Sequence, residues 1–313
     1  MANLTLRVWS EFLTPRELSQ PPVVELLARF HCGVLVQLSQ NRLDDQMAGA
    51  LCVLANAGVP DIGLWLLLDP AAGYWPSERN AQAVLELTRR VVEWHPPAGW
   101  LAIDLEPPLW QARRSRLRSA HENLNPARFA SASNTFRQVI DLAHGAGLQV
   151  LCAAHDYLAE DVWLRRPVLQ DLHEAPVLGL PWDLVSVMLY GSMMDAAPAD
   201  GRRWMFDTAR LLPSIPLGAS IGLTGVGILG NEPHYASPLE LAQDAAALKA
   251  AGVTDFAICS LEGMLASPNP EDWLRAVAEA EPARPPASAW ARRERVRRRV
   301  LAVMAAGCRA LRA

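Results

Sequence analysis

Two carboxylates stand two residues apart in the segment GWLAIDLEPP at 99–108, where an apolar run stops at two prolines. Carboxyl groups act as general acids, bases or nucleophiles when their protonation is tuned. If the run is a β-strand, Asp104 and Glu106 point to the same face, about 6 to 7 Å apart. Like charges at that spacing raise the pKa of the pair unless each acid has a partner. Because acids are rarely buried without a function, the pair is predicted to do chemistry.

Eight short runs rich in Val, Ile and Leu alternate with segments of helical periodicity. The runs lie at 4–12, 33–39, 61–69, 99–106, 148–156, 183–191, 216–225 and 255–263. Strands that alternate with helices pair in parallel through right-handed crossovers. Eight such units predict an α/β protein with a single (β/α)8 TIM barrel as one catalytic domain over residues 1–280.

This barrel would place Ala102, Asp104 and Glu106 on its inner face near the C-terminal ends of the strands, where active sites of the fold lie. Other predicted strands also end in polar residues, which is expected of an enzyme or a binding barrel. The candidate ligand-binding residues among these strand ends are Glu11, Asp69, His155, Asp156, Tyr190 and Glu262. Two have a structural alternative, because Glu11 and Asp69 would also serve as rim caps or ion-pair partners, and Asp69 precedes a proline that favours a turn.

Three strand ends, IDLE at 103–106, VMLYG at 187–191 and CSLEG at 259–263, resemble strands four, six and eight of the family 18 glycoside hydrolases. This is the chitinase and endo-N-acetylglucosaminidase group. The family has a (β/α)8 barrel, a DxxDxDxE motif on strand four, a Met-x-Tyr-Asp motif on strand six and a tryptophan at the end of strand eight. The resemblance covers roughly residues 4–280 and implies a barrel of the same kind.

The resemblance also implies roles for individual residues. Glu106 matches the catalytic acid of the family, and Asp104 matches the last aspartate of the motif, which orients the acetamido group of the substrate. Met188 and Tyr190 match the pair on strand six, where the tyrosine hydroxyl supports the acetamido carbonyl.

The chain departs from the family pattern at four positions. Gly99 and Ala102 stand where the first two aspartates of the motif would be, and Gly191 stands where an aspartate follows the tyrosine. Cys259 takes the position of the tryptophan on which the sugar stacks. The fold and the acid are therefore better supported than the substrate.

These residues together predict a glycosidase in which Glu106 protonates the leaving oxygen. In the substrate-assisted reaction that the resemblance implies, the 2-acetamido carbonyl of the sugar is the nucleophile. A sugar without that group needs a second carboxylate, for which Asp156 and Glu262 are the candidates.

The aromatic content suits a carbohydrate. Among 11 tryptophans, Trp75, Trp110 and Trp204 lie in predicted rim loops, where flat rings stack on sugar faces. Core packing explains Trp65 and Trp100 equally well. The expected partner is a carbohydrate substrate, with no cofactor and no nucleic acid.

Two other functions stay open. His155 and Asp156, with Glu262 and the pair on strand four, would hold a divalent metal in a barrel lyase or isomerase. The sequence has no H-x-H or HExxH spacing, so no metal is expected. The missing motif residues favour a carbohydrate-binding barrel that has lost catalysis, whereas the retained Asp104, Glu106 and Tyr190 argue against that loss.

The chain is predicted to end in a Pro/Ala-rich linker at 281–289 and a basic amphipathic helix at 290–313. Nine of the 29 basic residues and one of the 33 acidic residues lie at 284–313, which leaves an acidic body. The helix can therefore dock on that body, on a protein partner or on an anionic membrane surface. Its apolar residues near helical spacing are Trp290, Val296, Val300, Val303 and Met304.

The composition of the 313 residues, 51% hydrophobic and 20% charged, is typical of a soluble globular protein with a sizeable core. No apolar run reaches the roughly 18 residues of a membrane span, and the N-terminus lacks a secretory pattern, so a cytoplasmic location is expected. The five scattered cysteines predict reduced core thiols instead of disulfides or a zinc site.

Overall fold

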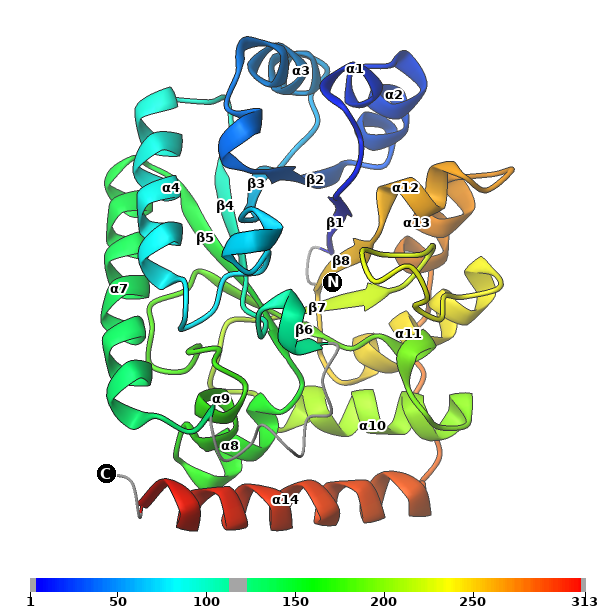
Figure 1. The fold of residues 1–313 in the computed structure, drawn as a ribbon. Coiled ribbons are helices and arrows are strands. Elements are labelled where there is room, and N and C mark those ends of the chain that lie inside the picture. The colour runs from blue at the N-terminus through cyan, green and yellow to red at the C-terminus, as the bar shows by residue number, and fades with distance from the viewer. Residues whose placement is uncertain (1–3, 113–122, 311–313) are drawn as a thin grey trace.

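The computed structural model describes residues 4–112 and 123–310, which form a closed barrel of parallel strands (Figure 1). Each strand pairs in parallel with the next along the chain, and the last closes on the first. The strands are β1 (Thr5–Ser10), β2 (Cys32–Leu38), β3 (Ile62–Leu66), β4 (Trp100–Asp104), β5 (Gln149–His155), β6 (Leu184–Met188), β7 (Leu217–Gly222) and β8 (Asp255–Cys259). The predicted (β/α)8 barrel is confirmed.

Helices and short 3-10 turns connect the strands around the outside of the barrel (Figure 1). The helices are α1 (Pro15–Leu18), α2 (Pro21–Arg29), α3 (Asp45–Asn56), α4 (Ala81–Trp94), α5 (Leu109–Ala112), α7 (Pro126–Gly145), α8 (Leu158–Leu164), α9 (Val168–Leu172), α10 (Pro198–Arg210), α11 (Pro238–Ala250), α12 (Leu261–Leu265), α13 (Glu271–Ala278) and α14 (Ala289–Ala310). The 3-10 turns are η1 (Gln40–Arg42), η2 (Pro70–Ala72) and η3 (Gly191–Met193).

Several helices begin where the sequence supplies a cap. Before α1, Thr14 accepts from the backbone N–H of Glu17, whose carboxylate accepts in return from the Thr14 backbone. The Asp44 carboxylate accepts from the Met47 N–H at 2.8 Å at the start of α3. Pro238 takes the first position of α11. These local signals fix the lengths of the loops that reach the barrel mouth.

The side chains of β4 alternate as predicted. Leu101 and Ile103 are buried between the barrel and the helices, whereas Ala102 belongs to the cluster inside the barrel. Aromatic rings fill much of that interior, and the rings of Trp9 and Trp65 meet edge to face with centroids 4.9 Å apart. The strand ends therefore stand above a packed interior.

The N-terminal end of the barrel is plugged by a buried arginine. Arg7 pairs with Asp61 at 3.0 Å and with Asp255, and its guanidinium lies 4.6 Å from the ring centroid of Trp100. Its charge is thereby compensated inside the barrel. The predicted site residues lie at the opposite, C-terminal ends of the strands.

Helix α14 lies along α8, α9 and α10 at the edge of the molecule, the red helix of Figure 1. Ala291, Ala302 and Ala305 are buried in this contact, which shows that the basic tail docks on the acidic body. The apolar residues expected to dock do not all do so, because Val296 and Met304 are 62% and 65% exposed. Among the described residues, no helix is long and apolar enough to cross a bilayer.

Candidate active site

Asp104 is the last residue of β4 and is buried at the barrel mouth. Its side-chain Oδ1 has no hydrogen-bond partner among the described residues. Burial, reinforced by the charges of Glu106 and Glu11, raises the pKa of the Asp104 carboxyl well above its ordinary value. Burial among neighbouring acids therefore favours the protonated form of Asp104.

Glu106 lies two residues beyond the end of β4 and is held by its backbone. Its N–H donates to the Pro76 carbonyl at 3.1 Å, while the preceding N–H of Leu105 donates to the Ala153 carbonyl at 3.0 Å. The Glu106 Oε2 lies 3.1 Å from His155 Nε2, and the Glu106 side chain is 20% exposed. The chain thus fixes the backbone of Glu106 and leaves its carboxyl within reach of a ligand.

An aromatic stack stands behind the pair of Glu106 and His155. The His155 ring centroid lies 5.5 Å from that of Tyr157, and the Tyr157 and His173 rings are stacked at 4.3 Å. Burial raises the pKa of the Tyr157 hydroxyl well above its ordinary value, so that hydroxyl keeps its proton. This stack packs against the His155 ring and limits its movement. Sequence reasoning missed Tyr157 and His173, although an aromatic residue two positions after a strand-end histidine is a usable signal.

Glu11 follows β1 and accepts a hydrogen bond from the Tyr74 hydroxyl. Burial, opposed by that bond and reinforced by the charges of Glu262, Glu232 and Glu106, raises the pKa of Glu11 to about 7. Glu11 therefore changes protonation near neutral pH, which a general base or nucleophile requires. Tyr74 was not predicted, because nothing in its own segment indicates that it reaches β1.

Tyr190 lies just beyond β6, and its hydroxyl lies near the Cys259 thiol at the end of β8. Burial, with the nearby Cys259, Asp104 and Glu106, raises the pKa of Tyr190 well above its ordinary value. The hydroxyl is thus a permanent donor in the same group of residues. Met188 is buried beside it at the end of β6, in register with His155 of β5.

Two predicted site residues have structural contacts. Glu262 Oε1 accepts from the Ser10 hydroxyl and the Phe12 N–H, both at 2.9 Å, and so holds the segment that carries Glu11. Asp69 is exposed and caps the turn η2 by accepting from the Ala71 N–H at 2.9 Å. Of the two interpretations of Asp69, the structure supports the cap at the rim, because the Asp69 carboxylate caps η2.

Asp156 points away from the other site residues. Its carboxylate accepts from the Trp204 indole N–H at 2.8 Å and from Arg298 of α14 at 2.7 Å. Burial alone would raise the pKa of Asp156, but Arg298 and Trp204 hold it below its ordinary value. Asp156 is therefore not available as the second carboxylate, contrary to the expectation from sequence.

The predicted rim tryptophans differ in exposure. Trp75 and Trp204 are buried, and the guanidinium groups of Arg295 and Arg298 cover the Trp204 ring at 3.7 and 4.5 Å from its centroid. Trp110, on α5, is 44% exposed. Of the three, Trp110 alone keeps a surface on which a sugar can stack.

Gly191 departs from the Met-x-Tyr-Asp pattern for a packing reason. A Cβ at Gly191 would lie 1.9 Å from a carboxylate oxygen of Asp244, which reaches over from α11. Asp244 in turn accepts from the Tyr235 hydroxyl. An aspartate at position 191 therefore has no room in this chain.

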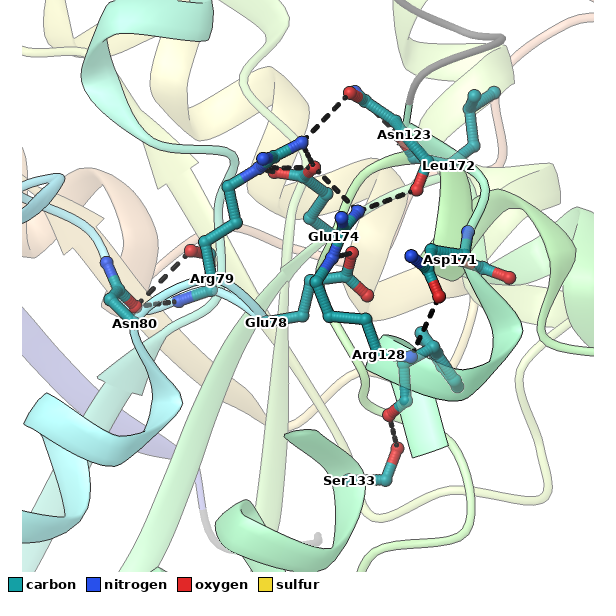
Figure 2. A network of polar contacts seen from close by, with 12 residues as sticks. Glu78, Arg79, Asn80, Asn123, Arg128, Ser133, Asp171, Leu172 and Glu174 are labelled. Atoms are coloured by element: carbon teal, nitrogen blue, oxygen red, sulfur yellow. Dashed lines mark hydrogen bonds and ion pairs between the residues drawn. The ribbon is translucent and has the colours of Figure 1, made fainter. Parts of the chain in front are cut away.

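The loop that carries Pro76 is anchored by a cluster of buried charges (Figure 2). Arg79 Nε donates to both carboxylate oxygens of Glu174 at 2.6 and 2.8 Å, and the Glu78 N–H donates to the Glu174 carbonyl at 2.7 Å. The Glu78 side chain pairs with Arg128 at 2.5 Å. This cluster ties the loop that holds the Glu106 backbone to α7 and to the end of α9. Within the described residues, no group of three or more His, Cys, Asp or Glu side chains is arranged to hold a metal ion.

No protein-family model and no curated protein matches the chain. Solved structures resemble it in fold. The PgaB (BpsB) glycoside hydrolase domain from Bordetella bronchiseptica superposes with a TM-score of 0.58 at 12% identity, over 88% of this chain and 99% of that chain.

Two further solved structures share the fold with somewhat lower TM-scores. A GH5-4 broad specificity endoglucanase from an uncultured bacterium gives a TM-score of 0.54 at 12% identity, over 90% of this chain and 95% of the other. A GH18 chitinase from Pseudoalteromonas aurantia gives 0.51 at 10% identity, over 88% and 99%. At such identities the likeness shows a divergent TIM barrel.

Proposed function

We propose that the protein is a glycoside hydrolase whose general acid is Glu106. The observation that carries this proposal is the pair of Glu106 and His155, 3.1 Å apart beside the buried Asp104. A general acid must reach its substrate, and of the two acids at the end of β4, Glu106 is the one with an exposed carboxyl. The three solved neighbours are described as a glycoside hydrolase domain, an endoglucanase and a chitinase, which supports the reaction class by analogy of fold.

In this reaction Glu106 gives its proton to the glycosidic oxygen as the bond from that oxygen to the sugar carbon breaks. The aglycone leaves as an alcohol, and positive charge develops on the sugar ring. The His155 ring, fixed by the stack behind it, orients the Glu106 carboxyl and stabilises the carboxylate that remains. Water later returns a proton to Glu106.

For a 2-acetamido sugar, the substrate's own carbonyl oxygen attacks the ring carbon. Asp104 Oδ1, which has no other partner among the described residues, accepts from the acetamido N–H. The Tyr190 hydroxyl, which lies near the Cys259 thiol, donates to the acetamido oxygen. Both groups stay protonated, because the pKa values of Asp104 and Tyr190 lie well above the ordinary ones.

For a sugar without an acetamido group, Glu11 is the second carboxylate. It takes the part first expected of Asp156 or Glu262, both of which are engaged in structural contacts. The pKa of Glu11 of about 7 leaves a large ionised fraction at neutral pH, and ligand binding that changes its surroundings shifts that fraction.

The proposal is tested with a panel of aryl glycosides, with and without a 2-acetamido group, in the presence of a chelator. The wild type is expected to cleave at least one class, and Glu106→Gln is expected to lose cleavage of the members whose leaving group must be protonated. Asp69→Asn, which changes an exposed turn cap, serves as the control and keeps full activity. Sugar binding that survives in Glu106→Gln, with no cleavage by the wild type of any glycoside, would favour a non-catalytic carbohydrate-binding barrel instead.

A further inference from the structure

Helix α14 turns a row of apolar side chains toward solvent. The row consists of Val296, Val300, Val303 and Met304, which are between 52% and 65% exposed. Their spacing of three and four residues places them on one face of the helix. A contiguous exposed apolar face on a folded protein marks an interaction surface.

The opposite face of α14 already holds the helix on the protein. Ala302 and Ala305 are buried there, and Arg298 reaches the Asp156 carboxylate at 2.7 Å. Arg309, near the other end of the helix, reaches Asp171 at 2.6 Å. The buried alanines and the ion pairs thus hold α14 on the protein, and the exposed apolar row takes no part in that attachment.

The outward face is also positively charged. Arg292 and Arg293 are exposed one turn before the apolar row, and the Arg297 side chain, at its edge, is 72% exposed. The only acidic residue of α14, Glu294, is turned away, with its side chain 15% exposed and bonded to Arg297 and Arg298. The face therefore offers the charges of Arg292 and Arg293, beside Arg297 that is paired with Glu294, while the rest of the chain is acidic.

We propose that the outward face of α14 binds the surface of an anionic lipid bilayer. A helix that lies in the interface plane buries an apolar face at the headgroup boundary and places arginines against anionic headgroups. The 22 residues of α14 form a ridge about 33 Å long at the edge of the molecule (Figure 1). One such ridge presents too little surface for a stable protein interface, which buries about 800 Å² on each partner, whereas a bilayer accepts a single helix. The acidic body is repelled by the same headgroups, which orients α14 toward the bilayer.

The test is flotation of the full chain with vesicles of phosphatidylglycerol and phosphatidylcholine, and with vesicles of phosphatidylcholine alone. The wild type is expected to bind the anionic vesicles at least tenfold more tightly, and binding is expected to weaken as salt is raised. Arg292→Gln/Arg293→Gln is expected to weaken binding about 30-fold, because each arginine near an anionic surface raises the affinity by a factor of about five. Val300→Glu is expected to abolish it.

Matched controls distinguish a loss of binding by the outward face of α14 from the effect of the same change in charge elsewhere on the surface. Leu239→Glu places the same charge at a 66% exposed position of α11, and Arg16→Gln/Arg89→Gln removes the same charge from exposed positions of α1 and α4. Both controls are expected to bind like the wild type. Equal binding by Val300→Glu and Leu239→Glu, or no binding to either vesicle, would overturn the proposal. A concentration-dependent dimer that Val300→Glu dissociates, without vesicle binding, would assign the face to a second copy of the chain.

Discussion

Buried carboxylates occur in two parts of the molecule with different partners. Beneath α14, three carboxylates are each paired with one arginine of that helix. The pairs are Arg298–Asp156, Arg295–Glu160 and Arg309–Asp171. At the barrel mouth, by contrast, Asp104, Glu106 and Glu11 have no arginine or lysine partner among the described residues, and the partners they do have are His155 and Tyr74. The same residue type is thus used for attachment in one place and left uncompensated in the other.

The difference in partners changes the protonation of the acids. The pKa of Asp156, against the raising effect of burial, is held below its ordinary value by Arg298 and Trp204. Burial without a cation raises the pKa of Asp104 and brings that of Glu11 to about 7. Asp156, next to Arg298, is therefore held in its charged form, whereas Glu11 can give or take a proton near neutral pH. This difference is what the proposed site at the barrel mouth rests on.

The largest expected effect is on activity at the mouth. Glu106→Gln removes the proton that the leaving oxygen needs and is expected to lower kcat by about 10²- to 10⁴-fold. Its unfolding midpoint in urea should stay close to that of the wild type, because the Glu106 side chain is not paired with an arginine. Steady-state kinetics measures the change in kcat, and a urea titration of the same preparation measures the unfolding midpoint. A large stability loss with little change in kcat would place Glu106 with the structural acids.

The next effect is on stability beneath α14. Arg298→Gln leaves Asp156 without its cation and is expected to lower the free energy of unfolding by about 2 to 4 kcal/mol. Arg297→Gln, on the same helix but exposed, should change it by less than about 0.5 kcal/mol. Urea unfolding of both variants and of Arg298→Gln/Asp156→Asn measures the pair. The double variant should recover part of the loss, because no unpaired charge is then buried.

A smaller effect is the dependence of stability on pH. The pKa of Glu11 is about 7 in the folded protein, above the ordinary 4.5, so folding favours its protonated form. The resulting stabilisation is complete below about pH 4.5 and is lost as the pH rises through 7. Thermal unfolding from pH 4.5 to 8 should show Tm falling with pH, and Glu11→Gln should reduce that slope. The exposed Glu25→Gln serves as a control, and a slope equal to that of Glu11→Gln would contradict the assignment.

The smallest effect is expected from Asp104→Asn. Because burial favours the uncharged form of Asp104, an amide of similar shape should change the free energy of unfolding by less than about 1 kcal/mol. Asp156→Asn, which removes a charged partner from Arg298, should cost clearly more. Urea unfolding of the two variants side by side makes the comparison. Equal losses would mean that Asp104 is ionised and paired in the folded protein.

The sequence predicts the barrel and the face on which β4 presents its acids, because both follow from short-range patterns. The period of two along Ala102, Asp104 and Glu106 fixes their common face, and caps such as Thr14 mark the helix starts. These patterns establish where each residue lies along its strand and which face of the strand it occupies.

The partners of the site residues do not follow from the sequence, because they come from distant segments. In sequence, Asp156 and Asp104 are both acids at the end of a strand. They differ because Arg298, 142 residues away in the chain, pairs with Asp156. Tyr74 reaches Glu11 across 63 residues. The orientation of α14 was likewise hidden, since alanines and arginines seat the helix and its valines face outward. Long-range pairing decided which acids were free to react.

The most direct measurement of the central claim is the dependence of Glu106→Gln on the leaving group. 2,4-Dinitrophenolate leaves the sugar without being protonated, whereas the methoxide of a methyl glycoside of the same sugar needs a proton to leave as methanol. If Glu106 is the general acid, Glu106→Gln should cleave the dinitrophenyl substrate at a rate near that of the wild type and lose about 10²-fold or more on the other. An equal loss on both substrates would contradict the account.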